Sequence, residues 1–270
     1  MIDGQGGGSL TSLPAGGVHA LPTIDVLGAR MFVGNLDEAG SLVVRRAVSG
    51  EGGFVCQCNV HLLVEAGRHR EVMAALEGAW CVFPDGAPVA WLERRLGYSE
   101  ARRVPGPDLM LRVLDDGRRE GLRHFFLGST EETLARLRAR IASLLPGVAI
   151  VGHHAPPVVD RWLPEPEITS AINDADAHVI WCALGAPKQE LWMLQHAQTI
   201  PSLLIGVGAA FDFHAGVKRR APELMQHFGL EWLHRLSSEP RRLGPRYLST
   251  NARFAALATA ELARRHARGR

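Results

Sequence analysis

Short apolar runs alternate with amphipathic stretches along most of the chain. The apolar runs have the length of β-strands and lie at Phe54–Cys58, Trp80–Phe83, His124–Leu127, Val148–Val151, Ala177–Ala183 and Ser202–Val207. Between them, apolar positions with helical spacing occur near His61–Ala66, Arg70–Leu76, Ala87–Leu96, Leu109–Arg119, Glu131–Leu144, Glu165–Asn173 and Lys188–His196. Continuously apolar strands separated by helices are typical of a parallel sheet that is covered on both faces. We therefore predict an α/β fold with a mostly parallel sheet.

The alternation stops after Gly208, and the chain divides into three predicted parts. These are a flexible, Gly-rich tail over residues 1–22, an α/β core over 23–215 and a basic helical appendage over 216–270. The tail lacks a basic segment followed by an apolar one, so it does not resemble a secretory signal. After Gly208 we expect a loop at 211–216, short helices at 222–228 and 231–237, and an Arg-rich helix from 240 towards 268.

The composition is that of a globular protein in a reducing compartment. Hydrophobic residues make up 46% and charged residues 21% of the sequence, as in ordinary soluble domains, and no apolar run approaches the ~20 residues that span a bilayer. Four cysteines lie inside apolar runs without CxxC spacing, at positions 56, 58, 81 and 182. They are expected to be reduced core thiols, which favours a cytoplasmic location.

Charge is distributed unevenly along the chain. The net charge is +2, but residues 216–270 contain 12 Lys/Arg against 4 Asp/Glu, a local +8 on an otherwise acidic body. On charge alone, a polyanionic partner at the appendage and a solvated Arg-rich helix are equally good interpretations. The apolar residues of the last helix have the same ambiguity, since they can face a membrane or pack on the core: Leu243, Tyr247, Leu248, Phe254, Leu257 and Leu262.

Glycine and polar residues follow the predicted strands. Ligands of parallel α/β sheets bind outside the carboxyl ends of the strands, where Gly permits close backbone approach and helix N-termini attract anions. The sequence therefore predicts one crevice lined by the residues after each strand, which are Asn59, Pro84–Gly86, Gly128–Thr130, Gly152–His154, Gly185–Gln189 and Gly206–Gly208.

Two of these segments contain candidate chemistry. Asp85 is either the N-cap of the following helix or a base that faces the crevice, and the N-cap preference of Asp slightly favours the first. In the second segment, Pro187 suits a first helical position, and Lys188 and Gln189 follow where a diphosphate or sugar would lie. A structural helix start needs no such polar cluster, so a substrate-binding role is favoured for Gly185, Lys188 and Gln189.

Three other motifs are rejected as cofactor or metal sites. The pattern at Gly206–Gly208 has Phe211 where a dinucleotide fingerprint needs its third Gly, and Asp174-Ala175-Asp176 precedes its strand, at the wrong end of the sheet. The pair His153-His154 has no ligand partner at a convincing spacing, so we expect it to line the crevice. We expect neither metal nor cofactor.

Several motifs together resemble the WecG/TagA/CpsF glycosyltransferases from about residue 24 to 247. They are Asn59-Val60-His61, Pro84-Asp85-Gly86, Arg103 through Leu109, Phe126-Leu127-Gly128, Leu184 through Glu190, Gly206 through Asp212, and a run of matching segments from Lys218 to Arg242. The resemblance implies a Rossmann-like core and an inverting, metal-independent transfer of a sugar from a UDP-sugar to a polyprenyl-diphosphate-linked sugar. It also implies that Asp85 is the general base.

The sequence departs from the family pattern at two places. Gln57 stands where members often have Thr, and Pro245, with Arg246 beside it, stands where a third C-terminal arginine is expected; Arg235 and Arg242 match. We expect Asp85 to be partly desolvated, because a carboxylate with its ordinary pKa is a weak base.

The remaining roles complete a predicted mechanism. The glycine loops at Gly185 and Gly208, together with Lys188, Arg235 and Arg242, would stabilise the leaving diphosphate, and Asn59, Gln189 and Asp212 would contact sugar hydroxyls. The appendage would attach the enzyme peripherally to the anionic inner face of the cell membrane. No nucleic acid is expected as a partner. Alternatives are a nicotinamide-dependent oxidoreductase and a non-catalytic sugar-nucleotide-binding scaffold.

Overall fold

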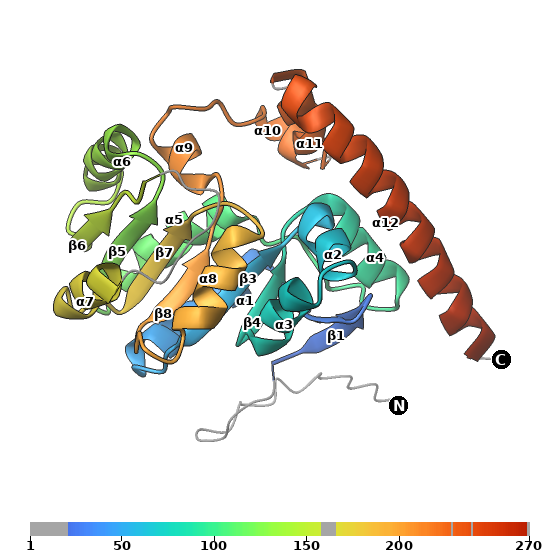
Figure 1. Ribbon diagram of the computed structural model, residues 1–270, viewed down its shortest axis with the longest axis horizontal. Helices are drawn as coiled ribbons and strands as arrows, with labels where there is room; N and C mark the ends of the chain where they lie inside the picture. Colours follow the sequence, from blue (N-terminus) through green and yellow to red (C-terminus); the bar gives the residue numbers. More distant parts are fainter. Residues whose placement is uncertain (1–20, 158–165, 228, 239, 269–270) are drawn as a thin grey trace, which may run out of the picture.

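The computed structural model describes residues 21–157, 166–227, 229–238 and 240–268, and for some residues within the last helices it describes the backbone alone. Its centre is a six-stranded sheet in the order β4-β3-β8-β7-β5-β6, in which all neighbours are parallel (Figure 1). The strands are β3 Gly53–Cys58, β4 Cys81–Pro84, β5 Arg123–Gly128, β6 Ala149–His154, β7 Val179–Ala183 and β8 Leu203–Gly206. The predicted tail lies outside the described residues, apart from its last two.

Helices cover both faces of the sheet, because the strands carry apolar side chains on both sides. One apolar cluster joins the sheet to α2 Val60–Ala66, α3 Arg70–Gly78, α4 Ala87–Arg95, α7 Pro166–Asp174 and α8 Lys188–His196. A second cluster joins the opposite face to α1 Leu36–Val48, α5 Gly106–Gly117, α6 Glu131–Leu144 and α9 Ala210–His214. The predicted α/β fold with a parallel sheet is therefore confirmed, and the predicted strands match to within a few residues.

A hairpin and two helices differ from the sequence-based expectations. A short antiparallel hairpin of β1 Thr23–Val26 and β2 Ala29–Phe32 precedes the sheet, and its turn uses positive φ at Leu27 and Gly28. Helix α1 was also missed, although Asn35 and Glu38 form a capping box at its start. The prediction of a loop at 211–216 was wrong, because α9 forms there and buries Phe211 completely.

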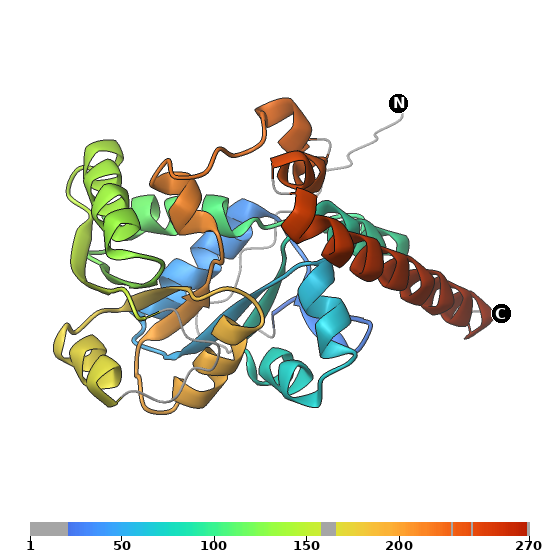
Figure 2. The same cartoon turned by 45° about the horizontal axis from the view of Figure 1, so that its top comes forward.

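The appendage consists of α10 Glu223–His227, α11 Glu231–Ser238 and the long α12 Pro240–Arg268. Helix α12 runs along the outside of the molecule (Figures 1 and 2), where it contacts α2 and buries Phe254 and Ala258 in the same apolar cluster as α2. Near its end, Arg265 Nη2 donates to the carbonyl oxygen of Asp25 at 2.8 Å. Among the described residues, no helix is long and apolar enough to cross a membrane.

The packing of α12 decides which way its apolar residues face. Phe254 is 6% exposed, and Leu262 packs against the same cluster, so a membrane-facing role for these two residues was wrong. The reason is that α2 offers an apolar surface at this point. Leu248 remains 78% exposed, whereas the Leu243 side chain lies outside the described residues.

Candidate active site

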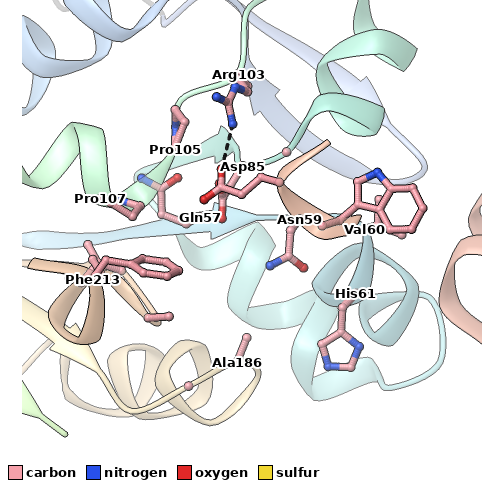
Figure 3. A pocket seen from close by; sticks show the side chains of 18 of the residues that line it. Gln57, Asn59, Val60, His61, Asp85, Arg103, Pro105, Pro107, Ala186 and Phe213 are labelled. Atoms are coloured by element: carbon pink, nitrogen blue, oxygen red, sulfur yellow. Dashed lines mark hydrogen bonds and ion pairs between the residues drawn. The ribbon is translucent and has the colours of Figure 1, made fainter. Parts of the chain in front are cut away.

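A cavity of about 690 Å³ lies at the carboxyl ends of β3, β4, β7 and β8. Polar residues from each of these ends line it, and Figure 3 shows Gln57, Asn59, Asp85 and Arg103 close together in its wall. The appendage forms part of the same wall through Lys218, Gly229, Glu231, Trp232, Tyr247, Thr250, Asn251 and Phe254. The cavity therefore lies between the parallel sheet and the C-terminal helices.

Asp85 lies in this cavity, directly after β4. Its backbone N–H donates to the carbonyl oxygen of Cys58 at 2.9 Å, which continues the pairing of β4 with β3 by one residue. The N-cap residue of α4 is Gly86, with φ 127°, and no side chain caps this helix. The alternative interpretation of Asp85 as a helix cap was therefore wrong. Its side chain is half-buried and belongs to the pocket.

Asn59 combines a structural role with a place in the pocket. Its Oδ1 accepts a hydrogen bond from the backbone N–H of Leu62 at 3.1 Å and thereby caps α2. Because Asn59 also lines the cavity, a contact with a ligand falls to its amide nitrogen.

Gln189 holds a glycine turn in place. Its Oε1 accepts from the backbone N–H of Gly208 at 3.2 Å, and its Nε2 donates to Oε1 of the buried Glu190 at 2.8 Å. Burial raises the pKa of Glu190 to about 7, against the lowering effect of the Gln189 hydrogen bond. Gln189 also lines the cavity, and its two hydrogen bonds to Gly208 and Glu190 fix the orientation of its amide there.

Gly185 and Lys188, in the same segment as Gln189, differ in whether they line the cavity. Gly185, with φ 83°, lines the cavity, whereas Lys188 does not. The proposed contact of Lys188 with a diphosphate therefore has no support from its position. The N–H of Gly208 is already used by Gln189, which also removes it from the predicted set of anion donors.

Asp212 belongs to an ion pair inside the cavity. Its Oδ2 lies 3.1 Å from Nζ of Lys218, and its Oδ1 accepts from Oγ of Ser129 at 3.4 Å. Asp212 lies on α9, the short helix that the sequence did not predict. Lys218 follows this helix, and its backbone N–H donates to the carbonyl oxygen of Asp212 at 3.0 Å.

Sequence reasoning gave no individual role to the cations that line the cavity. Arg103 Nη1 lies 3.2 Å from Oε2 of Glu231, and Lys218 is the second cation. Arg103 lies two residues before Pro105, the N-cap of α5, and a charged residue beside the Pro105-Gly106-Pro107 sequence is the signal that would have singled it out. The predicted Arg235 and Arg242 lie in α11 and α12, but their side chains lie outside the described part of the structure, as do those of Pro245 and Arg246.

The other sequence motifs lie away from the cavity. His153 is on the edge strand β6, where it contacts Glu131 at 3.4 Å, so the prediction that His153-His154 lines the crevice was wrong. Asp176 pairs with Arg123 at the opposite end of β7 from the cavity. In the described ranges, no three His, Cys, Asp or Glu side chains form a group suited to a metal ion.

The fold and the cavity define an α/β enzyme that binds its ligand at the carboxyl edge of a parallel sheet. Residues 24–268 match the glycosyl transferase WecG/TagA/CpsF family, so the chain belongs to this family and is a glycosyltransferase. Family membership decides against the oxidoreductase and the non-catalytic scaffold.

One curated relative comes from Bacillus spizizenii. It is named N-acetylglucosaminyldiphosphoundecaprenol N-acetyl-beta-D-mannosaminyltransferase and is 29% identical over 193 residues, which cover 71% of this chain and 74% of the relative.

Proposed function

We propose that this enzyme transfers a sugar from a UDP-sugar to a polyprenyl-diphosphate-linked N-acetylglucosamine, with inversion at the anomeric carbon and without a metal ion. The acceptor is proposed from the name of the Bacillus relative, and the N-acetylmannosamine named there is the first donor sugar to test. The observation that carries the proposal is the position of Asp85, which lies in the cavity at the carboxyl ends of the strands without serving as a helix cap.

Asp85 is proposed to act as the general base. Its carboxylate takes the proton of an acceptor hydroxyl while that oxygen attacks the anomeric carbon of the donor. The bond from the anomeric carbon to the diphosphate breaks on the opposite face, and UDP leaves with the bonding electron pair. Half-burial reduces the hydration of the carboxylate and so favours proton transfer to it.

The leaving diphosphate gains negative charge and needs fixed positive partners. Arg103 and Lys218 are the cations whose side chains line the cavity among the described residues. Each is paired with a carboxylate, Glu231 and Asp212 respectively. These carboxylates hold the cations in place before substrate arrives. We propose that the diphosphate shares or replaces these pairings.

The appendage is proposed to hold the enzyme on the inner face of the cell membrane, where a polyprenyl acceptor would be embedded. Large apolar side chains are exposed over residues 217–248, which run from the end of α9 into the first part of α12: Val217, Leu224, Leu230, Trp232, Leu233 and Leu248. Exposed basic residues Arg219 and Arg241 lie in the same stretch. Apolar side chains beside cations suit an anionic lipid surface.

A donor screen tests the proposed function. Purified full-length enzyme is incubated with a polyprenyl-diphosphate N-acetylglucosamine and each of several UDP-sugars, and the lipid product is identified by mass spectrometry. UDP-N-acetylmannosamine, UDP-N-acetylglucosamine and UDP-glucose form the minimal panel. We expect one donor to give a disaccharide lipid, and NMR of the new linkage to show inverted configuration.

A further inference from the structure

Gln57 has a buried amide that lacks a protein partner. The residue lies on β3, is 4% exposed and lines the cavity. Among the described residues, neither its Oε1 nor its Nε2 has a hydrogen-bond partner. Gln189 is equally buried in the same wall, yet both ends of its amide are bonded within the protein. Gln57 therefore differs from its neighbour in retaining both a donor and an acceptor.

The surroundings of Gln57 leave little room for its side chain to turn away. A Cβ atom on Gly106 would lie 3.7 Å from Cγ of Gln57 and 3.2 Å from the carbonyl oxygen of Val207, so the backbone closes over the stem of the side chain. Pro105 and Pro107 flank this glycine and make the segment rigid. An unpartnered amide in a rigid wall weakens the folded state, and a ligand that completes its hydrogen bonds explains why it is there.

The position of Gln57 indicates which part of a substrate it meets. Gln57 pairs in register with Phe83 on β4, two residues before Asp85. Figure 3 shows both side chains in the same part of the cavity. If Asp85 is the general base, the groups beside Gln57 belong to a sugar at the reaction centre.

The chemistry of a primary amide limits which groups of a sugar Gln57 can bind. Its N–H donor and its carbonyl acceptor point from the same edge, so its partner must present an acceptor and a donor side by side. Two neighbouring hydroxyls of a pyranose ring do this. An acetamido group does not, because its N–H and C=O point in opposite directions.

We infer that Gln57 binds two neighbouring hydroxyl groups of the sugar held at Asp85 and so selects for sugars that carry both. This inference rests on the proposed function and refines it. In a 2-acetamido sugar linked through C1, the 3- and 4-hydroxyls are the only such pair, and either the donor or the acceptor sugar can supply it.

The test combines Gln57→Leu with deoxygenated substrates. Donors lacking the 3- or 4-hydroxyl, and an acceptor lacking whichever of these hydroxyls is not attacked, are compared with the full substrates. In the wild type, removal of one bound hydroxyl should lower kcat/KM roughly tenfold or more. In Gln57→Leu, removal of the same hydroxyl should lower kcat/KM by less than about threefold, because the Gln57 amide that binds it is already missing. The substrate that shows this difference identifies the sugar.

Stability and UDP affinity separate this role from two others. Leucine has a similar volume and leaves no unpaired amide, so Gln57→Leu should raise the melting temperature by roughly 2 °C or more while it lowers transfer. A lower melting temperature would show a structural role and overturn the inference. UDP affinity should stay unchanged, and a loss of UDP affinity would place Gln57 at the nucleoside and also overturn it.

Glu93→Leu is the matched control. Glu93 is another buried residue whose carboxylate oxygens have no partner among the described residues, and it does not line the cavity. This variant should gain stability and keep full transfer. If removal of a hydroxyl lowers kcat/KM equally in the wild type and in Gln57→Leu, the inference about Gln57 is refuted while the proposed function stands. Absence of transfer by the wild type with every donor would refute the proposed function as well.

Discussion

Arg103 and Glu231 form a salt bridge in the wall of the cavity, with Nη1 and Oε2 3.2 Å apart. Arg103 belongs to the core, and Glu231 is the first residue of α11 in the appendage. Arg220 Nε donates to the other oxygen of Glu231 at 3.3 Å, and its two Nη atoms donate to Asp108. The arginine that we propose as a diphosphate ligand is thus joined directly to the segment that closes the cavity.

Glu231→Gln should loosen this connection. The two side chains of the pair are only about a fifth exposed, and the substitution leaves Arg103 and Arg220 without the charge of their shared partner. We expect a stability loss of about 1–3 kcal/mol, measured by urea denaturation. Limited proteolysis should also cut residues 216–238 faster than in the wild type.

The matched control for this variant is Glu223→Gln, an exposed glutamate at the start of α10. It removes the same charge from the same appendage and should leave stability and proteolysis unchanged. If both glutamine variants behave alike, the bridge to Arg103 does not hold the appendage.

Glu93 should make stability depend on pH. Burial raises the pKa of Glu93 from its ordinary value of 4.5 to about 8, against a smaller lowering by Arg94. The folded state therefore retains a proton that the unfolded chain loses. The contribution of protonated Glu93 to the free energy of unfolding is complete below about pH 4.5. It falls by ~1.4 kcal/mol per pH unit between about pH 4.5 and pH 8, and it levels off at higher pH. Glu190 acts in the same direction, with its pKa raised to about 7.

Glu93→Gln cannot ionise and should remove this contribution. Urea denaturation at pH 5.5 and pH 8.5 should show a smaller fall in stability for Glu93→Gln than for the wild type. The exposed Glu132→Gln on α6 is the control and should follow the wild type. A parallel fall for Glu93→Gln and wild type would show that the Glu93 carboxyl ionises normally.

The exposed apolar side chains of the appendage should contribute to membrane binding. Leu248 and Leu224 are 78% and 69% exposed, and replacing both by Asp adds negative charge where we propose lipid contact. The double variant should sediment with anionic vesicles at least about tenfold less than the wild type. Leu144→Asp, on the exposed end of α6, is the control. If the control loses as much binding, the appendage is not the membrane-binding surface.

Transfer should persist in EDTA. The cavity contains Arg103 and Lys218 to face the diphosphate. Two of its carboxylates, Asp212 and Glu231, are already paired with these cations, and the third, Asp85, is the proposed base. The assay compares initial rates with and without chelator, then with added Mg²⁺ or Mn²⁺. Loss of activity in EDTA and its recovery with a divalent ion would contradict the metal-independent mechanism.

The sequence predicted the sheet well because its strands are short, mostly apolar runs, such as Val179–Ala183. The hairpin at 23–32 was missed since its strands are four residues long and partly exposed. Helix α9 was missed because it is five residues long, too short to show a periodic pattern. The packing of α12 on α2 was not predictable, because a helical pattern does not say what covers its apolar face.

The prediction of site residues from the ends of strands was also incomplete, because it does not include the order of the strands or the packing of the appendage. Asn59, Asp85, Gly185 and Gly208 line the cavity, because each follows a strand at the same edge of the sheet. His154 is the last residue of β6, but β6 is the outermost strand of the sheet on the side away from β3 and β4, and this depends on the strand order alone. Glu231 comes from the appendage, and only tertiary packing brings it to Arg103.

Asp85→Asn tests the central claim most directly. Asparagine has nearly the same shape but cannot take a proton, so kcat for sugar transfer to the lipid acceptor should fall roughly 100-fold or more. UDP affinity, measured by calorimetry, should stay within about twofold of the wild type. Asp176→Asn, which changes a carboxylate at the opposite end of the sheet, should transfer normally. Near-normal turnover by Asp85→Asn, with the wild type active under the same conditions, would contradict the assignment of Asp85 as the general base.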